Sequence, residues 1–576
     1  MSESQENRVY PGITKPLSLE KPGPRDIQLT IELEKTLNLY GLYDSEERAQ
    51  QRCRVLQSLD DLTKQFVKMV YEKKGYTELA KKAGGKVFTY GSYRLGVNAT
   101  DADIDTLCVF PKYVDRIDFF TVMLELLKTH EHITDITAVT NAYVPLIKFK
   151  FNDIPIDFIC ARLNVDQIPE DIDLKDSNLL RNLDALSVRS LNGTRVADDI
   201  LDLVPNVDTF RTVLRCIKLW ATRKAIYSNV LGFLGGVAWA ILVARICQLY
   251  PNASASTVID KFFHILITWP WPSPVLLKAV EDGPIVPTIK PWNPKLNPVD
   301  RCHRMPIITP SYPSMCATHN VTPSTQRIII GELKQAAEMV EKIIAGSATW
   351  SQLFQPHRFF EMYHQYLQIT VIADDYNLQL KWAGLVEARI RQFVIKLEAV
   401  PPILLVHPFV DGFSENHICN NASDVSAMSL GRKPDNKNND TVSGKMIYSK
   451  TFYIGLYIRR AGLNQKLDVL PMTHLYTHTG KAQLTIDICV PIEEFKNTLR
   501  LWPEYSSRHM AVHIEAIHQS DLPKDLLTKS NTAGKRTLKP STSTNNSTTV
   551  TNKKSKRNNE ANNELPMTAT TATVAL

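Results

Sequence analysis

Three aspartates in this sequence have a spacing that suits divalent-cation chemistry. Asp103 and Asp105 lie in Ala-Asp-Ile-Asp-Thr-Leu, where the alternation of an extended strand places both carboxylates on one face. Asp157 lies in Ile-Pro-Ile-Asp-Phe-Ile, and a carboxylate among such apolar residues is costly to bury unless it is paired or bound to metal. Three carboxylates suit two ions about 3.5–4 Å apart, which stabilise the attacking and leaving oxygens of an in-line phosphoryl displacement. The sequence therefore indicates a two-metal site for phosphoryl transfer.

Each of these residues alone also fits a simpler explanation. An isolated Asp-x-Asp is usually a solvated strand edge or turn, and a single acidic residue in an apolar run is more often ion-paired with an arginine. The site hypothesis gains weight from Gly91 and Ser92, which come before the Asp-x-Asp at the end of a predicted strand and the start of a short helix. There a glycine lets backbone N–H groups approach a phosphate, and a serine adds a hydroxyl donor.

The segments around these residues predict a catalytic domain of mixed helices and strands over residues 27–206. Residues 27–83 have the apolar spacing of helices, and a Gly-Gly pair at 84–85 ends them. Strands are predicted over 87–90, 102–110, 144–151 and 154–160, the last two as a hairpin around Asn152 and Asp153. A helix is predicted over 118–128, so this unit is α/β or α+β.

The rest of the chain predicts two more domains and a tail, which makes the protein multidomain α+β. A mainly helical domain is predicted over 207–355, with an amphipathic helix from 207 and a proline-rich stretch over 269–323. Residues 356–525 predict a small α+β domain, with a helix over 380–397, strands around 452–458, 484–488 and 512–514, and a polar insertion over 411–439. Residues 1–26 form an N-terminal extension, and 526–576 are expected to be a disordered basic tail.

Composition excludes several classes of protein. A chain of 576 residues with 44% hydrophobic content suits a globular protein of about three domains. Of the formal charge of +7, residues 526–576 supply +6, so any nucleic-acid-binding surface on the folded part must be a local patch. Nine scattered cysteines without a Cys-x-x-Cys pair argue against a zinc ribbon or disulfide framework. Residues 230–244 predict a buried core helix rather than a membrane span, because they contain three glycines and end at Arg245.

Longer segments resemble the nucleotidyltransferase superfamily of the DNA polymerase beta type, and within it nuclear poly(A) polymerases of fungal type. These segments are FTYGSYRLGV, ADIDTLCV, IDFICAR, RNLDALSVRSLNGTRV, FRTVLRCIKLWA, GFLGGVAWAILVARICQLYP and HRMPIITPSYPSMCATHN, and the likeness covers roughly residues 10–520. The resemblance implies a nucleotidyltransferase domain, a helical central domain and an RNA-binding domain similar to an RNA-recognition motif. It also implies template-independent addition of AMP from ATP to the 3′ end of pre-mRNA, with release of pyrophosphate.

The resemblance assigns roles to individual residues. Asp103, Asp105 and Asp157 would be catalytic and would hold two Mg²⁺ or Mn²⁺ ions. The residues that would contact the nucleotide are Tyr90, Gly91, Ser92, Lys148, Lys218, Tyr227, Asn229, Gly236, Val237 and Thr322. Without the resemblance, Lys148 would be part of a solvated strand face and Lys218 a surface lysine with a buried stem. With it, Lys148 also matches a residue near the primer end.

Two segments depart from the family pattern. Residues 98–102 replace a loop that commonly carries His or Gly in relatives, with Ala99 in place of a polar contact and Asp101 as an extra carboxylate beside the metal site. The C-terminal domain lacks the Gly-Phe-aromatic signature with which RNA-recognition motifs stack bases. Its RNA contacts are therefore expected to be electrostatic. The candidates are Lys445, Lys450, Arg459, Arg460 and Lys466.

The implied partners are ATP, an RNA 3′ end and subunits of a cleavage and polyadenylation complex, with no membrane and a monomeric enzyme. Residues 553–557, Lys-Lys-Ser-Lys-Arg, have the composition of a nuclear import signal, which agrees with a nuclear location. The nucleotide site is expected to close over ATP by induced fit. Two alternatives remain: a uridylyl- or CCA-adding transferase of the same superfamily, and a non-catalytic RNA-binding scaffold, against which the three intact aspartates argue.

Overall fold

The computed structural model describes residues 10–140, 142–283, 289–419, 424, 428, 444–459, 486–523 and 526. They fall into two compact units. The first contains the described residues of Met1–Trp220, Leu234–Val321 and Glu332–Phe354, and the second those of Ala221–Phe233, Thr322–Gly331 and Gln355–Leu576. The expected import signal, the basic tail from 527 onward, Arg460 and Lys466 lie outside the described residues.

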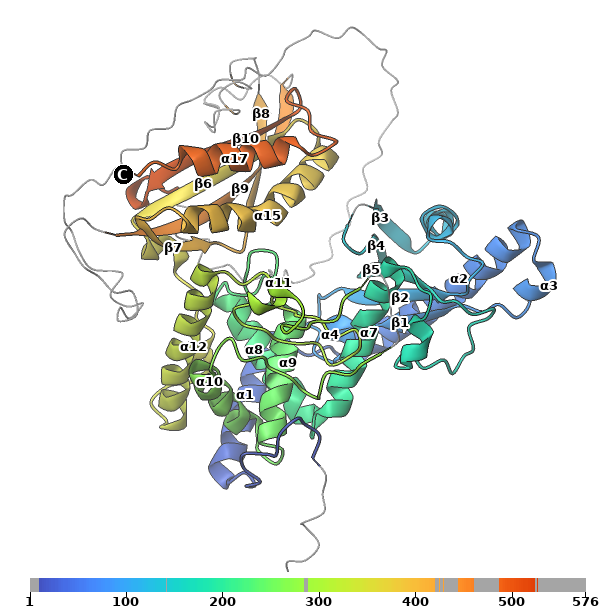
Figure 1. Cartoon of the computed structure of the whole chain (residues 1–576), viewed down its shortest axis with the longest axis horizontal. Coiled ribbons are helices and arrows are strands. Elements are labelled where there is room, and N and C mark those ends of the chain that lie inside the picture. Colours follow the sequence, from blue (N-terminus) through green and yellow to red (C-terminus); the bar gives the residue numbers. More distant parts are fainter. Residues whose placement is uncertain are drawn as a thin grey trace, which may run out of the picture. The chain divides into compact units, whose positions relative to one another are not determined.

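A five-stranded sheet in the first unit carries Asp105 and Asp157 (Figure 1). Its strand order is β1 (Lys86–Thr89), β2 (Ile104–Phe110), β5 (Ile154–Arg162), β4 (Leu146–Phe151) and β3 (Ile133–Val139). Strands β2 and β5 are parallel, and the other pairs are antiparallel. The predicted hairpin is confirmed, with positive φ at Asn152 (47°) and Asp153 (61°) as a tight two-residue turn requires. Strand β3 was missed because it is an edge strand with mostly exposed, polar positions and a bulge.

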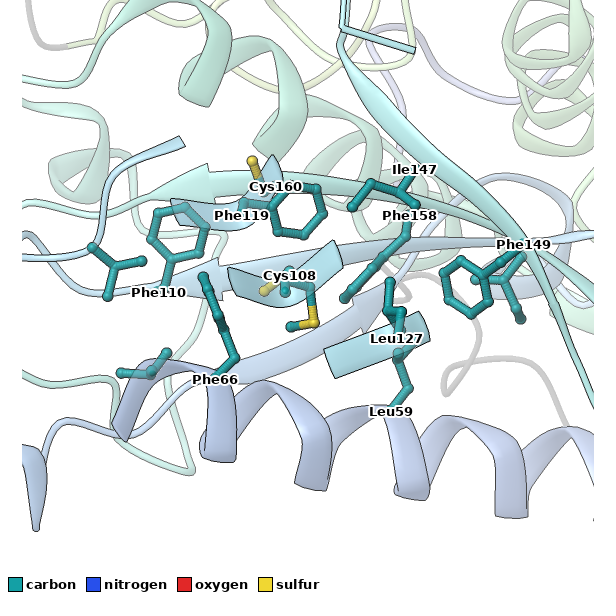
Figure 2. Close-up of a cluster of buried hydrophobic side chains, with 14 of the residues drawn as sticks. Leu59, Phe66, Cys108, Phe110, Phe119, Leu127, Ile147, Phe149, Phe158 and Cys160 are labelled. Atoms are coloured by element: carbon teal, nitrogen blue, oxygen red, sulfur yellow. The ribbon is translucent and has the colours of Figure 1, made fainter. Parts of the chain in front are cut away.

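The two faces of this sheet pack against different helices. On one face, even-numbered residues of β2 and β5 such as Cys108 and Phe158 meet α2 (Glu46–Lys73) and the helical segment made by α5 (Arg116–Asp118), the π-helix Phe119–Met123 and α6 (Leu124–Thr129). Figure 2 shows Leu59 and Phe66 of α2 directed at these strand residues. On the other face, odd-numbered residues such as Leu107 and Ile159 pack with α7 (Ala185–Leu203). Residues 105 and 157 therefore belong to the α7 face.

The remaining helices of the first unit include the predicted core helix. The described bounds are α1 (Pro24–Leu39), α3 (Thr77–Ala80), α4 (Gly91–Arg94), the 3-10 turn Ser177–Leu180, α9 (Gly236–Leu249), α10 (Ala255–Thr268), α11 (Pro298–Arg301) and α13 (Trp350–Leu353). Two longer helices, α8 (Val207–Arg223) and α12 (Pro323–Ile344), run across the unit boundaries. Helix α9 is buried from Ala238 to its end, although it begins six residues later than expected. Among the described helices, none has the length and apolarity needed to cross a membrane.

The second unit holds an antiparallel sheet with helices packed on it (Figure 1). The strand order is β10 (Met510–His518), β6 (Gln365–Ala373), β9 (Lys445–Ile458) and β7 (Ile403–Pro408), and β8 (Phe413–Cys419) also pairs with β9. The helical elements are α14 (Phe359–Met362), α15 (Tyr376–Glu398), α17 (Cys489–Arg500) and a 3-10 turn at Gln519–Asp521. Helix α15 contacts α17 through stacked Phe393 and Phe495 rings with centroids 4.7 Å apart.

Two predictions for this unit were wrong. The strand expected around 484–488 is not present at Ile486 and Ile488, which are buried just before α17, and Leu484 lies outside the described residues. Pro491 in the first turn of α17 was the missed signal for a helix start. Strand β8 lies inside the expected polar insertion, where no strand was predicted. Only alternate residues of this strand are covered, and most of the residues between them are polar, so the segment is polar in sequence.

A buried histidine makes the second unit sensitive to acid. His407 is fully buried, its Nδ1 lies 2.7 Å from the Tyr363 hydroxyl, and its Nε2 makes no hydrogen bond with any described residue. Burial, with the nearby His357, holds the pKa of His407 well below its ordinary 6.5. Below pH 6.5 the unfolded chain therefore binds one more proton than the native state. We therefore expect His407 to lower the unfolding free energy of this unit by about 1.4 kcal/mol for each unit by which the pH falls below 6.5.

Hydrogen exchange of β6 and β9 amides between pH 5 and 7.5 measures this slope. His407→Gln is expected to be less stable at neutral pH but to lack the His407 part of the slope. His364→Gln, at an exposed histidine of the same unit, is the matched control and should keep the wild-type slope. Equal slopes in wild type and His407→Gln would contradict the prediction.

Candidate active site

Strand register brings two of the three predicted aspartates side by side. Asp105 of β2 is the direct partner of Asp157 in the parallel strand β5. Asp103 was expected on the strand but comes just before β2, so its orientation depends on the preceding loop rather than on the sheet ladder. Lys148 of β4 is the register partner of Asp157 on the other side, and its Nζ lies 2.5 Å from Asp157 Oδ2. Lys148, one of the predicted nucleotide contacts, thus faces a catalytic candidate.

The three carboxylates share one electrostatic field. Burial, together with the charges of Asp103 and Asp157, raises the pKa of Asp105 to about 7, although Lys148 and Lys218 oppose the shift. Burial lowers the pKa of Lys218 to about 8, against the pull of Asp105 and Asp103. The site therefore concentrates negative charge that the two lysines offset only in part.

Gly91 brings the backbone against the Asp105 carboxylate. Its φ is +61°, and a Cβ added there would lie 2.2 Å from Asp105 Oδ2. The Tyr90 N–H donates to the Asp105 carbonyl at 3.1 Å, and the predicted short helix α4 starts at Gly91. Burial and the three aspartates raise the pKa of Tyr90, whose ring packs so closely on Gly193 of α7 that a Cβ there would lie 2.9 Å away. Glycine is needed at position 91 because its φ is positive and because a side chain there would collide with the Asp105 carboxylate.

The donor set fits a hard divalent cation. Carboxylate oxygens are the ligands that Mg²⁺ and Mn²⁺ prefer, and the mutual repulsion recorded by the raised pKa of Asp105 is what a bound cation relieves. In the described part of the chain, no three His, Cys, Asp or Glu side chains already converge on one point. Beside Asp157 the positive charge comes from Lys148.

A stripe of cations on α8 holds the loop that follows α4. Arg211 Nε donates to the Leu95 carbonyl at 3.0 Å, and Arg215 Nη2 to the Gly96 carbonyl at 2.6 Å. Lys218 Nζ lies 3.4 Å from the Val97 carbonyl. Positions 211, 215 and 218 share one helix face, so α8 binds three successive carbonyls. Sequence reasoning singled out Lys218 and missed both arginines, although their spacing was the available signal.

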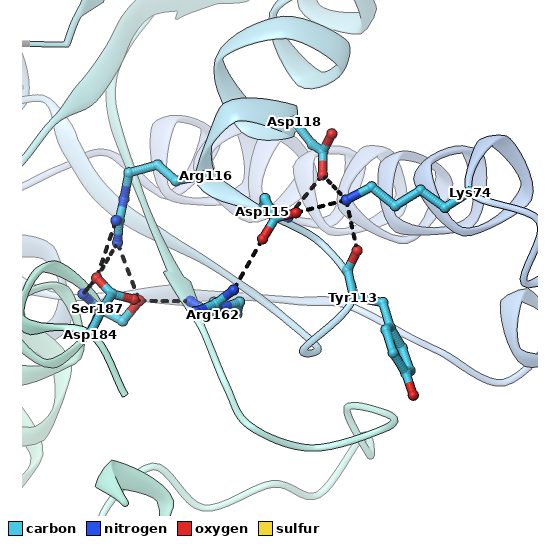
Figure 3. Close-up of polar contacts among 8 residues, drawn as sticks. All are labelled: Lys74, Tyr113, Asp115, Arg116, Asp118, Arg162, Asp184 and Ser187. Carbon is cyan, nitrogen blue, oxygen red and sulfur yellow. Dashed lines mark hydrogen bonds and ion pairs between the residues drawn. The ribbon is translucent and has the colours of Figure 1, made fainter. Parts of the chain in front are cut away.

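A second polar network supports the end of β5 away from the aspartates (Figure 3). Arg162, the last residue of β5, reaches Asp115 Oδ1 at 3.0 Å, and its N–H donates to Ser187 Oγ at 3.1 Å. Arg116 binds Asp184 Oδ1 at 3.1 Å, and Asp184 caps the start of α7. The network therefore joins β5 to the helix that covers the site's face of the sheet.

The other predicted nucleotide contacts are divided between the two units. Gly236 and Val237 form the first turn of α9, a helix that contacts α4 within the first unit. Tyr227, Asn229 and Thr322 belong to the second unit, where buried Thr322 donates to Glu398 Oε1 at 2.8 Å. Their place in a nucleotide pocket stays a prediction.

The predicted RNA contacts of the second unit are partly engaged elsewhere. Lys445 pairs with Asp374 at 2.7 Å, and Lys450 pairs with Glu387 at 3.0 Å. Arg459 is exposed at the end of β9. These ion pairs reduce the positive charge that Lys445 and Lys450 offer to RNA, so Arg459 is the strongest of the described candidates.

Comparison with known proteins gives consistent family matches along the chain. Residues 12–204 match the poly(A) polymerase nucleotidyltransferase domain, 209–356 the poly(A) polymerase central domain, and 358–536 the poly(A) polymerase predicted RNA binding domain. Poly(A) polymerase pla1 of Schizosaccharomyces pombe is 43% identical over 561 residues, covering 92% of this chain and 96% of that protein. Poly(A) polymerase PAPalpha of Candida albicans is 49% identical over 418 residues, covering 72% and 75%.

Solved structures of Cid1 poly(U) polymerase show a more distant likeness. One is 14% identical with a TM-score of 0.39, covering 57% of this chain and 99% of that chain. Another, with MgATP bound, is 14% identical with a TM-score of 0.40 and covers 57% and 99%.

Proposed function

This chain belongs to the poly(A) polymerase family, and we propose that it extends the 3′ ends of pre-mRNA with AMP from ATP through the carboxylates of Asp103, Asp105 and Asp157. Its poly(A) polymerase activity follows from close homology. The observation that best supports this choice of residues is the direct pairing of Asp105 with Asp157 across parallel strands, with Gly91 packed against Asp105.

Asp103 and Asp105 would hold both ions, and Asp157 would complete the ligands of one of them. Two Mg²⁺ or Mn²⁺ ions, when bound, lower the pKa of the RNA 3′-hydroxyl and neutralise charge on the triphosphate. The hydroxyl oxygen forms a bond to the α-phosphorus of ATP, the bond to the bridging oxygen breaks, and pyrophosphate leaves. Asp157 is the group that accepts the hydroxyl proton.

The triphosphate would bind between α4 and Lys218. Gly91 and Ser92 offer backbone N–H groups and a hydroxyl, and Lys218 offers a positive charge. With its pKa lowered to about 8, Lys218 is still mainly protonated at pH 7, and an anionic ligand raises the charged fraction. Lys148, which already faces Asp157, would contact the nucleotide and the primer end.

Recognition of the adenine base and its ribose is the least tested part of this proposal and rests on the resemblance. The proposed contacts to adenine and ribose are Asn229, Gly236, Val237 and Thr322. Tyr227 is a proposed phosphate contact, and Tyr90 is a further proposed nucleotide contact. The relatives are poly(A) polymerases, which favours adenine over the uridylyl- and CCA-adding alternatives. A nuclear location and subunits of the cleavage and polyadenylation complex as partners belong to the same proposal.

Each labelled nucleotide, offered alone with an oligo(A) primer, tests this function. We expect ATP to support elongation with one pyrophosphate released per residue added, and UTP, CTP and GTP to be used poorly. Preferential use of UTP or CTP would assign the chain to a different transferase. No elongation with any nucleotide, in Mg²⁺ or in Mn²⁺, would favour the non-catalytic scaffold.

A further inference from the structure

Cationic side chains hold six carbonyl groups of the loop between α4 and β2. This loop connects Gly91 and Ser92, on the phosphate side of the site, to Asp103. The α8 cations bind the carbonyls of Leu95, Gly96 and Val97. A single side chain from α2, Arg52, binds the carbonyls of Ala99, Thr100 and Ala102. The backbone on which Asp103 sits is therefore fixed by cations from two helices.

Arg52 is a fully buried guanidinium. Its Nη2 lies 2.9 Å from the carbonyl oxygens of Thr100 and Ala102 and 3.4 Å from that of Ala99. Its Nε forms an ion pair with Asp44 Oδ2 at 3.1 Å. A buried charge pair of this kind is weak evidence for a stabilising role, since apolar residues often stabilise such a position as well. The carbonyl contacts of Arg52 point to a role other than stability.

We propose that Arg52 is a positioning residue that fixes the Asp103 carboxylate for divalent-cation binding by clamping the carbonyls just before it. The Ala102 carbonyl belongs to the planar peptide that joins Ala102 to Asp103. Holding that oxygen at 2.9 Å therefore sets the orientation of the Asp103 backbone, which no strand pairing sets. This inference rests on the assignment of Asp103 as a metal ligand.

Asp44 completes the clamp from the loop between α1 and α2. Its Oδ2 also accepts a hydrogen bond from Asn98 Nδ2 at 2.7 Å, and Thr100 Oγ1 donates to the carbonyls of Tyr43 and Gly41 at 3.2 and 3.3 Å. Burial lowers the pKa of Arg52, and the charges of Asp44 and, to a smaller extent, Asp103 oppose that shift, so Arg52 and Asp103 are within electrostatic reach of each other.

The clamp does not depend on the side chains at which this loop departs from the family pattern. Arg52 contacts carbonyl oxygens, which every residue supplies, and not the side chains of Ala99 or Asp101. Asp101, which was expected to add a carboxylate beside the metal site, is exposed. Changes at 99 and 101 therefore leave the placement of Asp103 intact.

Binding of Mn²⁺ to the full-length protein, measured by electron paramagnetic resonance of the free ion, tests the inference directly. Arg52→Lys keeps the charge opposite Asp44 but lacks the planar fork that reaches several carbonyls. We expect it to weaken Mn²⁺ binding roughly 10- to 100-fold, the usual effect of losing a group that orients a metal ligand. The Mg²⁺ concentration for half-maximal elongation should rise in parallel, and kcat should largely recover at saturating Mg²⁺.

Arg195→Lys is the matched control. Arg195 is also buried, at 3% exposure, and binds the carbonyls of Asp176 and Tyr312 at 3.3 Å, far along the chain from Asp103. It should lose stability without losing Mn²⁺ affinity. Asp103→Asn should lose Mn²⁺ binding outright, which checks the ligand assignment itself.

The outcomes separate the two levels of the argument. If Asp103→Asn loses Mn²⁺ binding but Arg52→Lys binds as wild type, the positioning role is wrong and the site assignment stands. If Asp103→Asn binds Mn²⁺ normally, the proposed metal site is wrong. Should Arg52→Lys fail to fold, Asp44→Asn removes the counter-charge with little change in shape. A loss of Mn²⁺ affinity in Asp44→Asn, smaller than the roughly 10- to 100-fold loss expected for Arg52→Lys, would support the clamp. Unchanged affinity would overturn it.

Discussion

Asp157→Asn is expected to abolish primer elongation, lowering kcat by roughly three orders of magnitude while the chain stays folded. The amide has the shape of the carboxylate but lacks its charge, so it neither completes the ligands of a cation nor accepts the hydroxyl proton. A metal ion contributes several kcal/mol to such a transition state, and each 1.36 kcal/mol is a factor of ten in rate. Stability should change little, because losing the Lys148 ion pair is offset by relief of repulsion with Asp105.

Asp135→Asn provides a control on the same sheet. Asp135 pairs with Lys150 at 2.6 Å, as Asp157 pairs with Lys148 two residues earlier on β4. It is an exposed pair on the edge strand, with a small expected contribution to stability. Single-turnover elongation of a labelled oligo(A) primer, in Mg²⁺ and in Mn²⁺, should show wild-type rates for this variant. A rate for Asp157→Asn within tenfold of wild type would refute its catalytic role.

The three aspartates could be proposed as a site from the sequence because carboxylate spacing and apolar flanking residues are local patterns. The hairpin turn at Asn152 and Asp153 and the alternation of β2 and β5 are local features, and they fix which face each side chain takes. That Asp105 and Asp157 are direct neighbours could not be predicted, because parallel pairing joins segments about 50 residues apart and is set by tertiary packing. The sequence therefore named candidate residues, but the pairing of Asp105 with Asp157 came only from the structure.

Arg52 shows why the supporting groups were missed. It lies among polar residues of α2, so its neighbours in sequence suggest a solvated face. Its spacing from Val55 and Leu59, three and seven residues on, places it on the buried face, which was the available signal. Its partners, however, are backbone carbonyls, which carry no sequence pattern. The same holds for Arg211 and Arg215 on α8.

Gly91→Ala is expected to inactivate the enzyme through Asp105 rather than through loss of folding. The new Cβ would lie 2.2 Å from Asp105 Oδ2, so the Asp105 carboxylate must rotate away from its present position. Asp157 is the register partner of Asp105, so this rotation would disturb the pair of proposed ligands. Because the misplaced group is a proposed ligand, we expect kcat to fall by roughly a hundredfold or more. The positive φ of +61° adds a backbone cost of about 1–2 kcal/mol in unfolding free energy.

Gly75→Ala separates these two effects, because Gly75 has a φ of +84° and nothing within 4 Å of an added Cβ. Both variants should lose similar stability in urea unfolding, since both force an L-residue into the left-handed region. Only Gly91→Ala should lose activity, and its Mn²⁺ affinity should fall with it. If both variants keep wild-type kcat, the close approach of Gly91 to Asp105 does not matter for catalysis. If both lose activity equally, the cause is backbone strain, and the argument from the carboxylate fails.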